Sequence, residues 1–147
     1  LICFGPLALS AAYYSQTQSW SIANLATSLI IGISTSLILF CSHFHQVKDD
    51  LAAGKLSPIV RMGTEMGTIV LQWSTISIYA LTSIGIISGL LPIATLIVFI
   101  SLPWALKLIN FVWEYHDQPD LIRTCKYIAV RLHFVSGLLL AIGFCLP

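Results

Sequence analysis

Charge is scarce in this chain of 147 residues. Only 9% of the residues are Asp, Glu, Lys or Arg, and 57% are hydrophobic, whereas soluble domains carry about 25% charged residues. A chain so poor in charge cannot cover a water-facing surface, and its mean hydropathy is +0.90. The net charge of +1 gives no indication of a nucleic-acid partner. The sequence therefore predicts an integral, multi-pass membrane protein surrounded by lipid.

Cysteine motifs and a leader segment are also absent. The four cysteines contain no CxxC pair, and most lie in apolar segments, so we expect free thiols that are mainly buried. The chain starts with Leu1, and no basic segment precedes its first apolar run. Because a signal peptide has such a segment, we expect instead that the chain is part of a longer protein.

Long apolar runs define the predicted fold. A spanning helix needs about 20 mostly apolar residues to cross a hydrocarbon core of about 30 Å. The candidate segments are residues 1–14 (a partial span), 21–42, 67–90, 91–110 and 124–146. They predict an all-α transmembrane helix bundle in one domain over residues 1–147. Pro103 removes a backbone hydrogen bond inside the fourth segment and predicts a kink there.

The few charges are distributed unevenly along the chain. All seven basic and all six acidic residues lie either between the second and third predicted segments or at or after the end of the fourth. The other connections, Ser15–Trp20 and Gly89–Pro92, carry no charge. Alternate connections lie on the same side of a membrane, and basic residues favour the cytoplasmic side or its organellar equivalent. Both charged stretches should therefore share that side, with Tyr13, Tyr14 and Trp20 as aromatic anchors on the opposite side.

The first charged stretch has a pattern that indicates chemistry. If the second predicted span continues as a helix to about Ala53, His43, Gln46 and Asp50 share one face, because they lie at i, i+3 and i+7. Asp49 is one residue further round. Adjacent carboxylates form a hard-oxygen site of the kind that Mg²⁺ prefers, and Mg²⁺ commonly binds substrate phosphates at the same time.

Basic side chains follow these carboxylates in the sequence. Lys55 and Arg61 lie within a turn or two and can neutralise the remaining charge of a diphosphate. Ser57 and Pro58 are typical of the N-cap and first residue of a short helix. The stretch is interpreted as a metal–diphosphate site at a membrane surface. The alternative is an ordinary charged loop that serves only to set the topology.

A family resemblance supports the first interpretation. Residues Leu39–Thr64 resemble the second aspartate-rich motif of the UbiA superfamily of intramembrane prenyltransferases. They are most similar to its 1,4-dihydroxy-2-naphthoate phytyltransferase group, which occurs in cyanobacteria and plastids. Phe4–Tyr14 and Lys126–His133 resemble the same group, so the resemblance covers nearly the whole chain.

The resemblance implies a nine-helix fold around a cavity open to lipid, of which this chain is the C-terminal half. It implies a cyanobacterial plasma or thylakoid membrane, or a plastid membrane. Two aspartate-rich motifs would bind Mg²⁺ and a prenyl diphosphate, such as phytyl diphosphate. The first motif would precede Leu1, so residues 1–147 alone are expected to be inactive. An allylic cation would then be attacked by 1,4-dihydroxy-2-naphthoate, which loses its carboxylate, in phylloquinone or menaquinone biosynthesis.

The resemblance also implies roles for single residues. Asp50 matches the second aspartate of the D-x-x-x-D pattern, and Gln46 stands at the first. Lys48 stands where the group has an acidic residue, which leaves Asp49 and Asp50 as the carboxylates for catalysis and metal binding. The side chains expected to bind substrate are Lys55, Arg61, His43, His45 and Arg131.

Two other functions stay open at this point. The chain can belong to a UbiA-type enzyme with another aromatic acceptor, homogentisate or hydroxybenzoate. It can also be a non-enzymatic multi-span protein, such as part of a transporter, in which ionisable residues within the spans line a pathway. Because the charges cluster at one membrane face, a site at the mouth of a cavity is favoured over a conduit. The sequence does not distinguish a phytyl tail from a longer polyprenyl tail.

Overall fold

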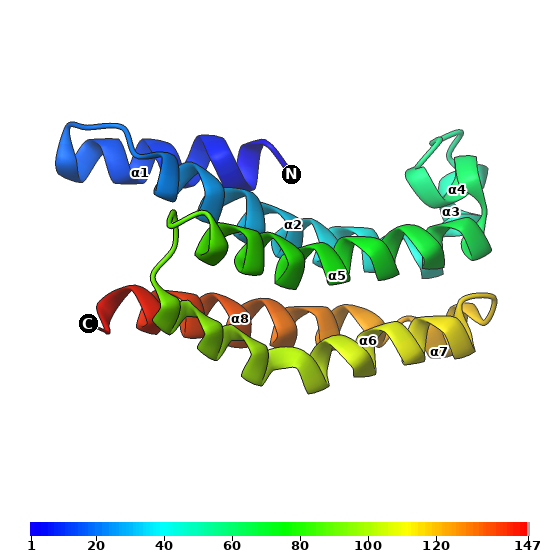
Figure 1. The fold of residues 1–147 in the computed structure, drawn as a ribbon. Helices are drawn as coiled ribbons and strands as arrows, with labels where there is room; N and C mark the ends of the chain where they lie inside the picture. The colour runs from blue at the N-terminus through cyan, green and yellow to red at the C-terminus, as the bar shows by residue number, and fades with distance from the viewer. Residues whose placement is uncertain (147) are drawn as a thin grey trace.

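In the computed structural model, residues 1–146 are described. The fold is 84% helical, with no strand among these residues, and its long helices run antiparallel (Figure 1). Four segments are long and apolar enough to cross a membrane: Ile22–His45, Thr64–Ile87, Ile93–Tyr115 and Pro119–Cys145. The predicted all-α transmembrane bundle is therefore confirmed.

Ten helical elements follow one another along the chain. They are η1 (Cys3–Leu7, a π-helical segment), α1 (Ala8–Thr17), α2 (Ile22–His45), α3 (Val47–Ala52), α4 (Pro58–Met62), α5 (Thr64–Ile87), η2 (Ile93–Ser101, a 3₁₀ helix), α6 (Leu102–Tyr115), α7 (Pro119–Ile122) and α8 (Cys125–Cys145). Helices α2, α5, α6 and α8 pack around a common core, and each contributes a buried leucine: Leu37, Leu71, Leu108 and Leu132. Elements η1 and α1 pack against α2 from outside this core.

The two charged stretches lie at the same end of the bundle. Short helices α3, α4 and α7 are found there, whereas the turn between α1 and α2 lies at the other end (Figure 1). At that uncharged end, the rings of Tyr14 and Trp20 stack with centroids 5.1 Å apart. The arrangement matches the topology that the charge distribution predicts.

The continuous helix expected to reach Ala53 is not observed. Helix α2 ends at His45, and Gln46 adopts a turn conformation (φ −93°, ψ 2°) before α3 begins. The break lets α3 turn and pack against α4, a tertiary contact that helical periodicity cannot reveal. The Asp50 backbone N–H still donates to the Gln46 carbonyl at 2.8 Å, so Asp50 remains on the face of His43.

The fourth span also differs from its predicted bounds, residues 91–110. It runs from Ile93 to Tyr115, and its first nine residues form the 3₁₀ helix η2. The α-helix starts at Leu102, so Pro103 occupies the first turn, where its missing N–H has no intrahelical role. The interruption predicted at Pro103 therefore takes the form of a change of helix type. The other spans end within a few residues of their predicted bounds.

The 3₁₀ segment is packed closely against α8. Its buried residues Thr95, Val98 and Ser101 recur every third position, which places them in one line on a helix with three residues per turn. A Cβ atom added to Gly143 of α8 would lie 2.7 Å from Thr95 Cα. The contact therefore depends on glycine at this position, and it fixes the uncharged end of the bundle.

Candidate functional site

Asp50 is the centre of a polar cluster at the charged end. It lies on α3, and its exposed fraction is only 6%. Lys55 Nζ donates a hydrogen bond to Asp50 Oδ1 at 3.1 Å. His43 Nδ1 lies 3.6 Å from Asp50 Oδ2, which is too long for a hydrogen bond. Two residues predicted from the sequence, His43 and Lys55, thus meet around the carboxylate of a third, Asp50.

Several polar atoms of this cluster lack a hydrogen-bond partner. Within residues 1–146, five buried side-chain nitrogen or oxygen atoms are unpaired, and three of them are His43 Nδ1, Asp50 Oδ2 and Ser57 Oγ. Buried polar groups are normally paired, so an unpaired one needs a water, an ion or a ligand. The cluster therefore has unused capacity to bind a polar ligand.

The pKa of Asp50 is lowered from its ordinary value. The Ser57 hydroxyl, which acts on the carboxylate without making a hydrogen bond of standard geometry, contributes most to this lowering of the pKa. Burial opposes it, and the hydrogen bond and positive charge of Lys55 lower the pKa further. Asp50 is therefore ionised at neutral pH and can act as a metal ligand. Ser57 was expected to cap α4, but its side chain makes no capping hydrogen bond and acts on Asp50 instead.

The other predicted residues of the first charged stretch lie at the same end of the bundle. Asp49 is exposed, and Gln46 is half-buried in the turn before α3. Arg61 is exposed, and its Nε donates to the Leu56 carbonyl at 3.1 Å. His45 Nδ1 is buried without a partner. In the part of the chain that the structure describes, none of these side chains bonds directly to Asp50.

The expected Mg²⁺ ligands can be compared with this geometry. Among residues 1–146, no three His, Cys, Asp or Glu side chains group closely enough to hold a metal ion by themselves. A buried carboxylate oxygen with no partner nevertheless fits Mg²⁺, which often takes one or two carboxylates and completes its shell with substrate phosphates and water. Asp50 fits as one ligand of such a shared ion, and Asp49 is adjacent to it on α3.

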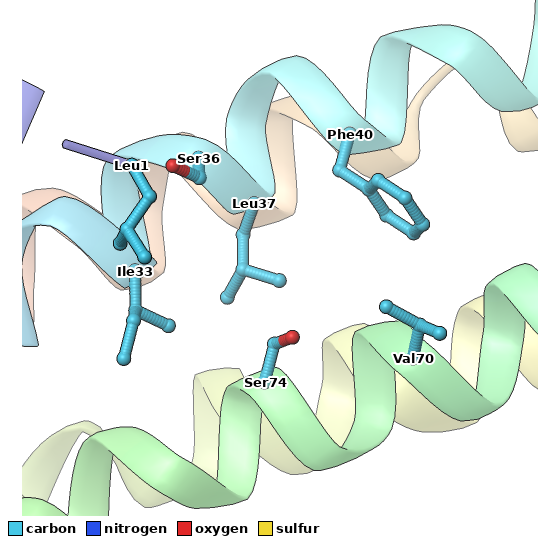
Figure 2. Close-up of a pocket in the computed structure, with 7 residues that line it drawn as sticks. All are labelled: Leu1, Ile33, Ser36, Leu37, Phe40, Val70 and Ser74. Carbon is cyan, nitrogen blue, oxygen red and sulfur yellow. The ribbon is translucent and has the colours of Figure 1, made fainter. Parts of the chain in front are cut away.

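An apolar groove lies along the middle part of α2, next to Leu1. It encloses about 220 Å³ between α2 and α5, and Figure 2 shows Phe40 and Val70 pointing toward each other across it. Ser36, which lines the groove, precedes His43 by two helical turns, so both lie on one face of α2. A hydrocarbon chain in this groove can therefore extend toward the Asp50 cluster.

A larger cavity of about 470 Å³ lies between α1, α2 and α8. Its walls are mainly apolar, and its polar lining includes Asn24, Thr27 and His133. His133 Nδ1 lies 2.8 Å from Ser34 Oγ. The cavity thus combines a membrane-embedded apolar volume with a few fixed polar groups, which is the usual composition of a small-molecule site.

Arg131 lies away from the Asp50 cluster, in a third cavity of about 270 Å³ between α6 and α8. Its guanidinium and the Lys107 ammonium lie over the ring of Trp104, 5.5 and 5.6 Å from the centroid. Among the described residues, neither cation forms an ion pair with a carboxylate. Sequence reasoning missed Lys107, because nothing in the linear order shows that α6 places it beside Arg131.

Comparisons with known proteins agree with these features. The model of the UbiA prenyltransferase family matches residues 1–144. The chain is 58% identical over 144 residues to 2-carboxy-1,4-naphthoquinone phytyltransferase of Synechocystis sp., covering 98% of this chain and 47% of that protein. It is 39% identical over 148 residues to the chloroplastic 2-carboxy-1,4-naphthoquinone phytyltransferase of Arabidopsis thaliana, covering 95% of this chain and 39% of that protein.

The chain therefore spans less than half the length of both of these relatives. No solved structure matches it significantly. The family match extends over almost the whole chain, and the four long apolar helices identify an integral membrane protein. The chain belongs to the UbiA prenyltransferase family.

Proposed function

We propose that the protein transfers a phytyl or related prenyl group from its diphosphate to 1,4-dihydroxy-2-naphthoate, in the formation of phylloquinone or menaquinone. The observation that carries the proposal is the 58% identity, over 98% of this chain, to a protein named as a naphthoquinone phytyltransferase. The ionised, buried Asp50 supports it, because a diphosphate leaving group needs a metal or cationic site at the membrane surface.

The reacting form of the acceptor follows from chemistry. The relatives are named for 2-carboxy-1,4-naphthoquinone, and a quinone ring is electron-poor. Attack on an allylic cation requires an electron-rich ring, which is the dihydroxy form with two more electrons and two more protons. The proposal therefore takes the reduced acceptor as the substrate.

The donor site is assigned to the charged end. Prenyltransferases of this family generally depend on a divalent metal, and Asp50, with Asp49 beside it, would hold Mg²⁺. When bound, that ion neutralises negative charge on the departing diphosphate. Ser57 and Lys55 keep Asp50 ionised, and the hydrogen bond from Lys55 orients its carboxylate. The diphosphate oxygens would accept hydrogen bonds from the nearby polar side chains, namely His43, His45, Gln46 and Arg61.

The donor tail is assigned to the groove between α2 and α5. This groove begins on the same face of α2 as His43 and is lined mainly by apolar side chains. Apolar walls keep water away from the allylic carbon, which water would otherwise capture. Arg131 is proposed to contribute positive charge to substrate binding from α8, over the face of Trp104.

Membranes that contain this chain within a protein of the full length of its relatives provide the test. They would be supplied with Mg²⁺, phytyl diphosphate and one reduced acceptor at a time: 1,4-dihydroxy-2-naphthoate, homogentisate or hydroxybenzoate. We expect prenylated product with the naphthoate only. Product from another acceptor would preserve the reaction class and change the substrate. No product with any acceptor would favour a non-enzymatic membrane protein, and a series of longer prenyl diphosphates would define the tail.

A further inference from the structure

Two cations within the membrane spans line one cavity and have no anionic partner. Lys107 is on α6 and Arg131 is on α8, and both side chains are exposed. Among residues 1–146, the ion pairs all involve Asp50, so neither cation is paired with a carboxylate. Charged side chains inside a span are costly and usually mark a functional site. The pair is therefore a candidate for binding an external anion.

Both cations lie over the same aromatic ring. The guanidinium carbon of Arg131 is 5.5 Å from the centroid of the Trp104 ring, and Lys107 Nζ is 5.6 Å from it. Each contact is favourable by itself, but two positive charges held at one ring repel each other. Cations that only extend toward water would separate. An anion bound between them replaces this repulsion with attraction, so the convergence indicates an anion site.

The cavity is a slot that follows the two helices. It encloses about 270 Å³, and the residues of its α8 side recur at i, i+3, i+4 and i+7: Thr124, Tyr127, Ile128 and Arg131. From Thr124 to Arg131 the slot follows the helix for ~10 Å at the α-helical rise. Thr124 immediately precedes α8 at the charged end of the bundle. The slot therefore starts at the membrane surface, and Arg131 lies at its inner end.

The charged groups of both cations can reach the level of the lipid headgroups. Arg131 follows the start of α8 by six residues, and Lys107 precedes the end of α6 by eight. Their Cα atoms are thus ~9 and ~12 Å from the charged ends of these helices. Long basic side chains at this depth extend back toward the polar boundary, where the phosphates of a bilayer lie. A phosphate at that boundary can therefore meet both cations in the slot.

The lining of the slot fits a phosphate that is attached to a hydrocarbon. The Arg131 guanidinium presents paired N–H donors that match two phosphate oxygens, and the Lys107 ammonium adds a point charge. The Tyr127 side chain is 61% exposed and lies one turn before Arg131, so its hydroxyl can donate a further hydrogen bond. Phe111 and Ile128 supply apolar walls. This combination suits the head and the upper chain of an amphiphile.

The slot is separate from the proposed donor site. In Figure 1, α6 and α8 form the lower pair of long helices, and α2 and α5 form the upper pair. The groove assigned to the donor tail lies between α2 and α5 and shares no lining residue with the slot. Asp50 is on α3, which directly follows α2. The slot is therefore a second anion-binding position, on the other pair of helices.

We propose that the slot between α6 and α8 binds the phosphate group of an anionic membrane amphiphile, through Arg131 and Lys107 over the face of Trp104. Basic pockets between membrane helices on the cytoplasmic side recognise anionic lipid headgroups in this way. Two amphiphiles carry the required group: an anionic phospholipid of the bilayer, and the prenyl diphosphate, for which the slot would serve the substrate role proposed for Arg131. The phospholipid is expected, because the slot lies on the helix pair away from the donor groove. The inference extends beyond the proposed function and does not depend on it.

Lipid binding to the purified protein tests the proposal. A protein of the full length of the relatives would be titrated in detergent with phosphatidylglycerol or phosphatidylcholine, and bound lipid would be counted by native mass spectrometry. Phosphatidylglycerol should bind at least tenfold more tightly, because the choline cation of phosphatidylcholine offsets its phosphate charge. The double variant Lys107→Ala, Arg131→Ala should weaken phosphatidylglycerol binding at least tenfold. Equal binding of the two lipids, or unchanged binding in the double variant, would overturn the inference.

Two further variants distinguish the slot from surface charge in general. Lys48→Ala removes the same charge from an exposed lysine of α3 at the same end of the bundle, and phosphatidylglycerol binding should not change. Thr124→Trp keeps every charge and fills the outer end of the slot. The Thr124 side chain makes no capping hydrogen bond, so this variant should fold, and binding should weaken at least threefold. An equal loss in Lys48→Ala and the double variant, or full binding in Thr124→Trp, would contradict the slot.

Competition identifies the source of the phosphate. Phytyl diphosphate or inorganic phosphate would be added to the protein with bound phosphatidylglycerol, and neither should displace the lipid at an equal concentration. Displacement by phytyl diphosphate would support the phosphate site and assign it to the donor. Displacement by inorganic phosphate would show that the hydrocarbon part is not needed, and it would overturn the assignment to a membrane amphiphile.

Discussion

The two ends of the bundle are built in opposite ways. At the uncharged end and toward the middle, helices meet backbone to backbone: a Cβ on Gly143 would lie 2.7 Å from Thr95 Cα, and one on Gly5 would lie 2.8 Å from Gly32 Cα. At the charged end, short helices hold buried polar atoms without partners, including those of Asp50 and Ser57.

The two ends of the bundle therefore differ in role: the uncharged end is built for close helix packing, and the charged end for ligand binding. Close packing of small residues holds membrane helices together where no hydrophobic effect acts between them. Unpaired polar groups cost stability, and they are retained where a ligand satisfies them. Substitutions at the uncharged end should therefore change stability, and substitutions at the charged end should change activity at nearly constant stability.

The largest expected effect is all-or-none and concerns which side each end faces. Cysteines introduced at Lys48 and at Thr17 should react with an impermeant reagent from opposite sides of the membrane. The charges of the two ends and their separation in the bundle support this outcome. Intact and permeabilised vesicles would be compared by labelling, in a background without the native cysteines. Labelling of both positions from one side would remove the basis of the comparison.

The next effect is on turnover at the charged end. In a protein of the full length of the relatives, Asp50→Asn should reduce kcat by about 100-fold or more, the scale seen when a key charge-stabilising group is removed. Asp49→Asn should cost less, because Asp49 is exposed. Membrane abundance should stay close to normal in both variants, as measured by quantitative immunoblotting. Near-normal turnover of Asp50→Asn across a Mg²⁺ titration would show that Asp50 is not a metal ligand and that this charged stretch serves only to set the membrane topology.

Much of this charged end could be predicted from the sequence, but not its contacts. Apolar runs predicted the spans because membrane thickness sets their length, and helical spacing placed His43 beside Asp50. The break at Gln46 was missed because it depends on the packing of α3 against α4. The action of Ser57 on Asp50, and the position of Lys107 beside Arg131, depend on neighbours that periodicity does not identify.

A stability effect should appear at the uncharged end. Gly143→Ala inserts a methyl group against Thr95 Cα and should destabilise the bundle by about 1–3 kcal/mol, the usual cost of overpacking, less the higher helix propensity of alanine. Unfolding by SDS in mixed micelles would measure it. Gly137→Ala on the same helix is the matched control, since its Cβ has room, and its stability should not fall. Equal destabilisation by both variants would contradict the close-packing argument.

The smallest effect should be a shift in pH dependence. Asp50 has a folded-state pKa below its ordinary value of 3.8, so its interactions are complete above that value and are lost as the pH falls through the lowered pKa. Ser57→Ala removes the main cause of the lowering, and the acid limb of the kcat profile should move to higher pH. Ser88→Ala, at the uncharged end, is the control. A shift to lower pH, or an equal shift in the control, would exclude this role of Ser57.

The 3₁₀ helix η2 has a consequence for the bilayer that surrounds the protein. A 3₁₀ helix rises about 2.0 Å per residue, compared with 1.5 Å in an α-helix, so the nine residues of η2 extend ~4–5 Å further than α-helical residues would. The segment can shorten by becoming α-helical, which would rotate Thr95, packed on Gly143 of α8, relative to Ser101, whose hydroxyl contacts Tyr79 of α5. The span should therefore favour one hydrocarbon thickness, and thinner bilayers should impose hydrophobic mismatch at this helix before the others.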